Sequence, residues 1–139
     1  MTKITVDVLI TAPVDHAWMV WTTPAYIMKW NSASDDWHCP AAKNDLRVGG
    51  RFTATMAAKD GSMSFDFLGT YSEVIPNQRI AYSMEDGRTV EVTFEALGNQ
   101  TKITEIFDPE TTHPVEFQKA GWQAILDRFK IVAETVTAS

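Results

Sequence analysis

The feature that most constrains the fold is a series of tight-turn signatures that divides the middle of the chain into short segments. Asp-Gly pairs stand at 60–61 and 86–87, a Gly-Asn pair at 98–99 and a Pro-Asn pair at 76–77. Asp-Gly and Gly-Asn pairs tolerate the positive φ that two-residue hairpin loops demand. The segments between the turns are predicted to be strands, at 51–58, 62–75, 79–85, 88–97 and 101–108. Because connections this short cannot join parallel strands, we expect an antiparallel meander.

Another strand and two short helices are expected before the meander. Apolar and polar residues largely alternate over 4–11, which is typical of a strand with one buried face. Pro13 suits the first position of a short helix through Trp18 to Trp21. Thr23 and Pro24 suit the cap and first residue of a second helix that ends near Lys29. From residue 30 to 50 the sequence predicts an irregular loop with at most a short strand at 36–39, and the Gly-Gly pair at 49–50 predicts a bend.

One long amphipathic helix is predicted from Pro114 to about Val136. Its apolar residues follow the spacing of a single helical stripe: Trp122, Ile125, Leu126, Phe129, Val132, Ala133 and Val136. A single sheet of this length is curved, and only this helix is long enough to cover its buried face. The expected class is α+β, with a curved antiparallel sheet of about six to seven strands, two short helices after the first strand and a long C-terminal helix.

Length, charge and cysteine content exclude several classes of protein. The 139 residues suit one domain spanning 1–139. A net charge of -6 repels phosphate backbones and anionic lipid, so we expect no nucleic-acid partner, and no apolar run approaches the roughly 18 residues of a membrane span. The single Cys39 and three histidines exclude an internal disulfide and a zinc site of the usual spacing. We expect no metal and no cofactor, and a cytoplasmic location, while the oligomeric state cannot be inferred.

Several segments carry a resemblance to a known family. They are Thr11 to Trp18, Trp30, Asp45 to Phe52, Gly69 to Pro76, and Gly121 with Trp122. With the order of elements, they make the chain similar, over about residues 3–135, to the START-like (SRPBCC) superfamily, and within it to the C-terminal domain of the activator of the heat-shock protein 90 ATPase. The resemblance implies a helix-grip fold with a cavity for apolar ligands, and the activator's N-terminal domain has no counterpart in these residues. Members include lipid carriers, hormone receptors, polyketide aromatase/cyclases and co-chaperones, so the fold leaves function open.

Strand parity predicts which side chains face such a cavity. Residues two apart on a strand share a face, so the aromatic sets of the central strands are expected to point inward. Gly69 is expected to permit a bend, and Gly121 a close approach by sheet or ligand. The predicted ligand-binding residues are Trp30, Trp37, Phe52, Met56, Phe65, Phe67, Tyr71, Tyr82, Met84, Phe94, Glu105, Phe107, Trp122 and Leu126.

Two polar residues are candidates for acid–base chemistry. Glu105 lies between Ile103 and Phe107 on the inward face, where its carboxylate would lose solvation and either find a donor or take up a proton. The alternative is that Ile106 points inward, or that Glu105 sits in water at the open end of the sheet. His38, in the loop from 30 to 40, could act as a general base. The alternative there is that the tryptophans of this loop close one end of the sheet and its polar residues satisfy turn amides.

Three functional classes follow from these residues. The favoured class is a binding protein for a small apolar or aromatic molecule. The second is a cyclase- or hydrolase-type enzyme that uses Glu105 or His38 as acid or base in the same cavity. The third is a stress-response co-chaperone that contacts a chaperone, although polar residues on alternate strand positions predict a polar outer face.

Overall fold

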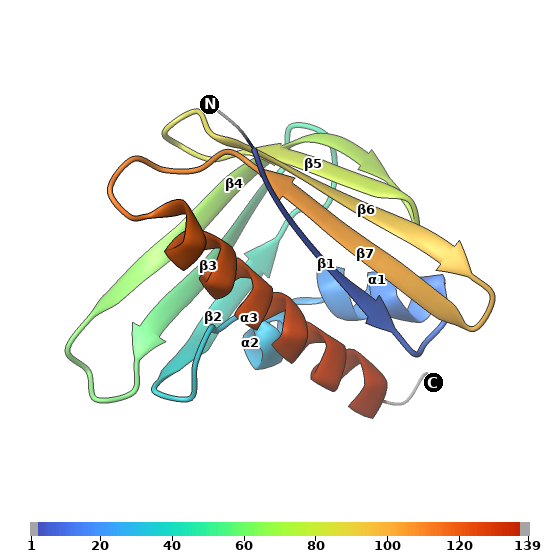
Figure 1. Cartoon of the computed structure of the whole chain (residues 1–139), viewed down its shortest axis with the longest axis horizontal. Coiled ribbons are helices and arrows are strands. Elements are labelled where there is room, and N and C mark those ends of the chain that lie inside the picture. Colours follow the sequence, from blue (N-terminus) through green and yellow to red (C-terminus); the bar gives the residue numbers. More distant parts are fainter. Residues whose placement is uncertain (1–2, 137–139) are drawn as a thin grey trace.

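The computed structural model describes residues 3–136 and contains one seven-stranded antiparallel sheet curved around a long helix (Figure 1). In chain order, the elements are β1 (Ile4–Ile10), α1 (Val14–Thr22), α2 (Pro24–Trp30), β2 (Trp37–Asn44), β3 (Arg51–Ala58), β4 (Ser64–Ile75), β5 (Arg79–Ser83), β6 (Thr89–Leu97), β7 (Gln100–Phe107) and α3 (Val115–Thr135). The strand order is β1-β7-β6-β5-β4-β3-β2, so β2 to β7 form a meander and β1 returns beside β7. Within the described residues, no helix combines the length and the apolarity needed to cross a membrane.

The turns of the meander have the backbone conformation that their residues favour. Asn77, Gly61, Gly87 and Gly98 have φ values of 64°, 80°, 91° and 69°. The predicted strands between them are confirmed, each to within two residues at either end. β1 alternates between buried and exposed residues along its whole length, as predicted. Local sequence therefore accounts for six of the seven strands.

β2 corrects the prediction of an irregular loop. The strand runs over eight residues and pairs with β3, with a register shift between His38 and Ala41. Pro40 lies in this irregular stretch. A proline has no backbone N–H to donate, and an edge strand such as β2 tolerates this because one of its sides has no neighbouring strand. A smaller correction concerns Pro13, which lies at the N-cap of α1 in an extended conformation instead of inside the helix.

α3 covers the concave face of the sheet and gives the helix-grip arrangement (Figure 1). It packs against β1, α1 and α2. Leu126 and Phe129 of its apolar stripe are fully buried, together with Ile10, Ile103 and Phe107 of the sheet. The core is thus concentrated on the side of β1 and β7.

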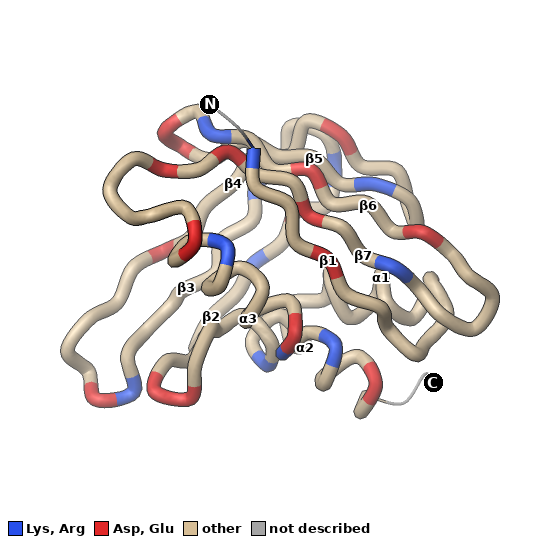
Figure 2. Tube along the Cα trace, in the orientation of Figure 1, with Lys and Arg blue, Asp and Glu red and all other residues tan. Residues whose placement is uncertain are grey.

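The convex face of the sheet is polar. Arg79 of β5 pairs with Glu73 of β4 and with Glu91 of β6, the latter at 3.1 Å. Acidic and basic residues are interspersed along the chain, and Figure 2 shows no segment in which Lys and Arg gather alone. The aromatic residues of the central strands therefore belong to the opposite, concave face.

Candidate functional site

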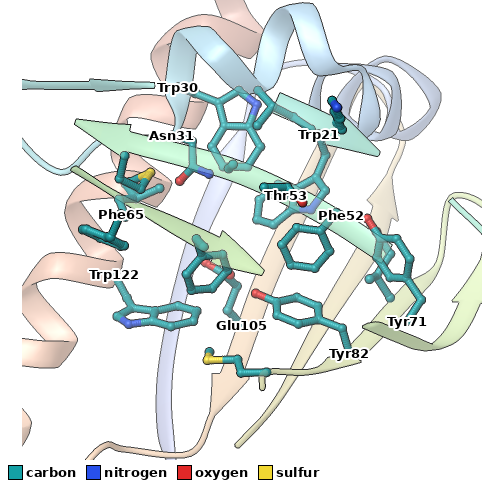
Figure 3. Close-up of a pocket in the computed structure, with 18 of the residues that line it drawn as sticks. Trp21, Trp30, Asn31, Phe52, Thr53, Phe65, Tyr71, Tyr82, Glu105 and Trp122 are labelled. Carbon is teal, nitrogen blue, oxygen red and sulfur yellow. The ribbon is translucent and has the colours of Figure 1, made fainter. Parts of the chain in front are cut away.

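A cavity of about 340 Å³ lies between the concave face of the sheet and the helices (Figure 3). This volume falls within the range of small-molecule pockets, which is about 300–1,000 Å³. The lining residues are mostly apolar or aromatic: Trp21, Ile27, Trp30, Asn31, Lys43, Phe52, Thr53, Ala54, Met56, Phe65, Phe67, Tyr71, Ile80, Tyr82, Met84, Arg88, Glu105, Trp122 and Ile125. The cavity therefore occupies the half of the concave face that β3, β4 and β5 form.

Small residues on β3 and β4 make room for the aromatic wall. Ala54 lies in the middle of β3, opposite Phe67 of β4. A Cβ atom at Gly69 would lie 2.3 Å from the ring of Phe52 and 2.9 Å from that of Tyr82. The absent side chain of Gly69 thus leaves space for two cavity rings.

The aromatic wall is a set of rings in mutual contact. Phe52 and Tyr82 meet edge to face, with ring centroids 4.7 Å apart. Phe67 lies 5.9 Å from Phe52 and 6.2 Å from Trp122 of α3. The Phe52–Tyr82 and Phe67–Trp122 pairs are edge to face and the Phe52–Phe67 pair is tilted, and ring contacts at these distances favour a defined geometry. The wall therefore presents a preformed apolar surface.

Glu105 places a carboxyl group inside this apolar surface. The residue is 5% exposed, and Val6 of β1 and Val92 of β6 are its partners in the two ladders. Burial alone raises the pKa of Glu105 to about 8, and no hydrogen bond or charge in residues 3–136 opposes that shift. Ile106 is only half-buried, so the alternative in which it points inward is excluded. At neutral pH most of the carboxyl is protonated.

Tyr82 adds a second polar group to the same region. Its hydroxyl makes no hydrogen bond within the described chain, and Figure 3 shows it pointing toward Glu105. Burial, and secondarily the charge of Glu105, raise the pKa of Tyr82 well above its usual value. Tyr71 differs, because its hydroxyl donates to Oδ1 of Asn44 at 2.6 Å. Glu105 and Tyr82 are therefore largely buried side chains whose polar atoms open into the cavity and make no hydrogen bond within residues 3–136.

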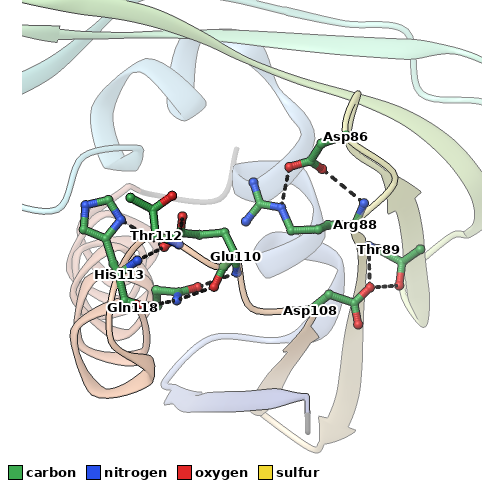
Figure 4. A network of polar contacts seen from close by, with 8 residues as sticks. All are labelled: Asp86, Arg88, Thr89, Asp108, Glu110, Thr112, His113 and Gln118. Carbon is green, nitrogen blue, oxygen red and sulfur yellow. Dashed lines mark hydrogen bonds and ion pairs between the residues drawn. The ribbon is translucent and has the colours of Figure 1, made fainter. Parts of the chain in front are cut away.

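The rim carries the charged side chains. Phe65 is 51% exposed and Lys43 is also exposed, so this part of the lining opens to solvent. Arg88 follows β5 and pairs through Nε with Oδ2 of Asp86 at 2.7 Å (Figure 4). Its charge is thus already compensated at the surface.

A polar network fixes the connection between β7 and α3 (Figure 4). Nε2 of Gln118 donates to the carbonyl oxygens of Glu110 and His113, at 3.0 and 2.8 Å. The carboxylate of Asp108 accepts hydrogen bonds from the backbone N–H and hydroxyl of Thr89 on β6. These bonds hold the first turn of α3 relative to the sheet, and Trp122 lies one turn further along.

Four of the residues predicted to bind a ligand lie outside the cavity lining. Phe94 is buried against Trp18 and Trp21 of α1, because α1 covers that end of β6. Phe107 lies behind Trp122, stacked at 3.8 Å, and Leu126 faces the core while Ile125 faces the cavity. Trp37 lies on β2 against Phe65, with ring centroids 6.0 Å apart. The predicted residues that do line the cavity are Trp30, Phe52, Met56, Phe65, Phe67, Tyr71, Tyr82, Met84, Glu105 and Trp122.

Sequence reasoning missed a group of lining residues that come mainly from the helices and from the β2–β3 edge. They are Trp21, Ile27, Asn31, Lys43, Thr53, Arg88 and Ile125. The apolar stripes of the two short helices contained a signal for Trp21 and Ile27. Lys43 had none, because the short strand expected at 36–39 ends before it.

His38 and Cys39 lie away from the cavity. His38 is half-buried on β2 and is not part of the lining, so only Glu105 of the two acid–base candidates faces the cavity. Cys39 is buried, and burial raises the pKa of its thiol, which disfavours a nucleophilic thiolate. Asp35 pairs with Arg128 at 2.8 Å. In residues 3–136, no group of three His, Cys, Asp or Glu side chains is arranged to hold a metal ion.

Comparisons with known proteins identify relatives over nearly the whole chain. An AHSA1-like protein from Aeromonas hydrophila is 42% identical, with a TM-score of 0.89 and 99% of each chain covered. A protein from Cytophaga hutchinsonii is 55% identical, with a TM-score of 0.82, over 95% of this chain and 92% of that one. A Chromobacterium violaceum protein, 22% identical with a TM-score of 0.86 over 97% of this chain and 99% of that one, shares the fold. A comparison with curated proteins gives no match.

The sequence profile described as "Activator of Hsp90 ATPase homolog 1-like protein" matches residues 11–134. This range includes α1, α2, six strands and nearly all of α3, and therefore the whole cavity lining. The chain belongs to the Activator of Hsp90 ATPase homolog 1-like family, within the START-like superfamily.

Proposed function

We propose that this protein binds a small apolar or aromatic molecule in the cavity between the concave face of the sheet and α3. The observation that carries this proposal is a cavity of about 340 Å³ whose aromatic wall surrounds a single buried carboxyl group. Such a combination of apolar walls with few polar groups is typical of ligand sites. The aromatic surface supplies affinity, and the polar groups orient the ligand.

The affinity expected from such a site for a simple probe is low. Burying about 250 Å² of apolar ligand surface is worth roughly 6 kcal/mol. Part of this gain is lost as translational and rotational freedom, while the preformed wall limits the cost of ordering side chains. We expect dissociation constants of roughly 0.1–1 mM for an unoptimised aromatic probe.

The first test uses N-phenyl-1-naphthylamine, a neutral probe whose fluorescence rises in apolar surroundings. Wild-type protein should give a saturable increase. Met56→Trp places a larger ring in the lining and should weaken binding by about tenfold or more through overpacking. Met63→Trp makes the same change at a residue that is 62% exposed in the β3–β4 turn, and it should leave binding unchanged.

Two results would contradict the proposal. One is a fluorescence increase that does not saturate in the wild type. The other is equal loss, or no loss, in the two tryptophan variants, since either would place the probe outside the cavity. Thermal unfolding of both variants establishes that they are folded.

The catalytic and chaperone alternatives would need further features. An enzyme of cyclase or hydrolase type would use Glu105 as its acid or base, and turnover lost in Glu105→Gln with binding retained would identify it. A co-chaperone would need a surface for its partner, whereas the convex face is polar and carries the ion pairs of Arg79. The cavity therefore supports binding more directly than either alternative.

A further inference from the structure

Resting on the proposed function, we infer that the cavity selects apolar molecules that present a hydrogen-bond acceptor, a carbonyl or phenolic oxygen, to Glu105 and Tyr82 together. Both side chains are more than nine-tenths buried and both line the cavity. Neither makes a hydrogen bond within residues 3–136. A ligand oxygen between them would satisfy both groups at once.

The protein itself offers Glu105 no partner. Val6 and Val92 are its neighbours across the sheet, and Ile103 and Phe107 precede and follow it on the same face of β7. Because the carboxyl of Glu105 opens into the cavity, an apolar ligand atom placed against it would displace solvent and leave the carboxyl unpaired, whereas a ligand oxygen would replace the lost hydrogen bond. The same argument applies to the hydroxyl of Tyr82, whose surroundings include the rings of Phe52 and Phe67.

The two groups come from strands that are separated by only one strand. Tyr82 pairs with Val90 of β6, and Glu105 pairs with Val92 of the same strand. Glu105 and Tyr82 lie two strand spacings, roughly 10 Å, apart across the sheet and two residues apart along β6, so one ligand group can meet both only if the side chains lean toward each other. Figure 3 shows the phenol of Tyr82 directed toward Glu105 in this way.

The protonation state of Glu105 favours an acceptor over a cation as the ligand's polar group. Because burial raises its pKa to about 8, the carboxyl is mainly a neutral donor at pH 7. The other titratable or charged groups of the lining are Tyr71, Tyr82, Lys43 and Arg88. The ladder partners of Glu105 on β1 and β6 are the apolar residues Val6 and Val92, and α3 contributes Trp122 and Ile125 to the lining. Within residues 3–136 no cation stabilises the carboxylate form of Glu105, and Arg88 is already paired with Asp86.

The experiment compares three probes with the same naphthalene body and a two-carbon substituent. They are 2-acetylnaphthalene, which has an acceptor, 2-ethylnaphthalene, which has none, and 1-(2-naphthyl)ethylamine, which is an ammonium ion at neutral pH. Displacement of N-phenyl-1-naphthylamine gives the three affinities. At about pH 6.5 we expect the ketone to bind about 3- to 10-fold more tightly than the ethyl compound, the ratio that one net hydrogen bond produces.

Variants and pH assign this preference to the two residues. Glu105→Leu removes the donor and should reduce the ketone-to-ethyl ratio toward one, whereas Glu95→Leu on the exposed part of β6 should not. Tyr82→Phe should lower the ratio in part. Raising the pH from about 6.5 to 9.5 should weaken ketone binding in the wild type, because the ionised carboxylate repels an acceptor, and Glu105→Gln should remove that pH dependence.

Three other results would each contradict the inference, and they differ in what they imply for the proposed function. Equal affinity for ketone and ethyl compound would contradict it while leaving the proposed function in place. Tightest binding of the ammonium probe, with affinity rising from pH 6.5 to 8, would make Glu105 a counter-ion and also contradict it. Failure of all probes to bind would contradict the proposed function and this inference together.

Discussion

Glu105 places an acid in the apolar centre of the concave face, and this placement has a consequence for stability. Its pKa is about 8 in the folded protein, compared with an ordinary value of 4.5. Between these values the folded protein binds a proton that the unfolded chain has released. Stability from this residue is therefore greatest below about pH 4.5 and falls as the pH rises toward 8.

The variant Glu105→Gln tests this consequence. Since one pKa unit corresponds to 1.36 kcal/mol, the wild type should lose on the order of 3 kcal/mol relative to Glu105→Gln between about pH 5 and pH 8. Urea unfolding of both proteins at the two pH values measures the difference. Glu95→Gln is the matched control at an exposed position and should follow the wild type. The same pH dependence in wild type and Glu105→Gln would mean that the carboxyl is hydrated.

At the scale of elements, two glycines have opposite roles. A Cβ at Gly69 of β4 would collide with the rings of Phe52 and Tyr82. A Cβ at Gly121 of α3 would meet nothing within 4 Å, so this glycine is not needed for a close approach. The sheet therefore makes no close approach to Gly121, which corrects that part of the prediction, and the backbone freedom of glycine weakens the helix.

The same substitution at these two positions should have opposite effects. Gly69→Ala should destabilise the protein by about 1–3 kcal/mol and weaken probe binding, because two cavity rings must move. Gly121→Ala should stabilise it by up to about 1 kcal/mol, as alanine does in helix interiors. Urea unfolding and the N-phenyl-1-naphthylamine titration measure both effects. A neutral Gly69→Ala would show that the rings are free to shift.

The elements also show what sequence reasoning could and could not predict. Turn pairs and period-2 alternation located β3 to β7 and placed Glu105 among the inward residues, because these signals are local. β2 was predicted only as a short strand at 36–39, because its residues do not alternate regularly and Pro40 argues against a longer strand. Phe94 and Leu126 were assigned to the cavity although α1 covers the first and the rotation of α3 turns the second into the core. Such packing between distant elements has no signature in a single sequence.

At the scale of the whole molecule, the cavity results from an asymmetric grip. α3 packs on the side of β1, whereas β3, β4 and β5 carry the aromatic wall. The family resemblance predicted the sheet and the helix that grips it. It could not predict the volume of the cavity or its rim, which depend on the tilt of α3 and on the rings beside Gly69.

Methyl NMR during titration with 2-acetylnaphthalene tests most directly whether a small aromatic molecule enters this cavity. Ring currents of a bound probe shift nearby methyl signals, and the cavity lining contains Met56, Met84, Ile80 and Ile125. We expect saturable shifts of these four signals, with little change at the exposed Met28 and Ile131. Shifts confined to exposed methyl groups, or no saturable shift at the four cavity residues, would contradict it.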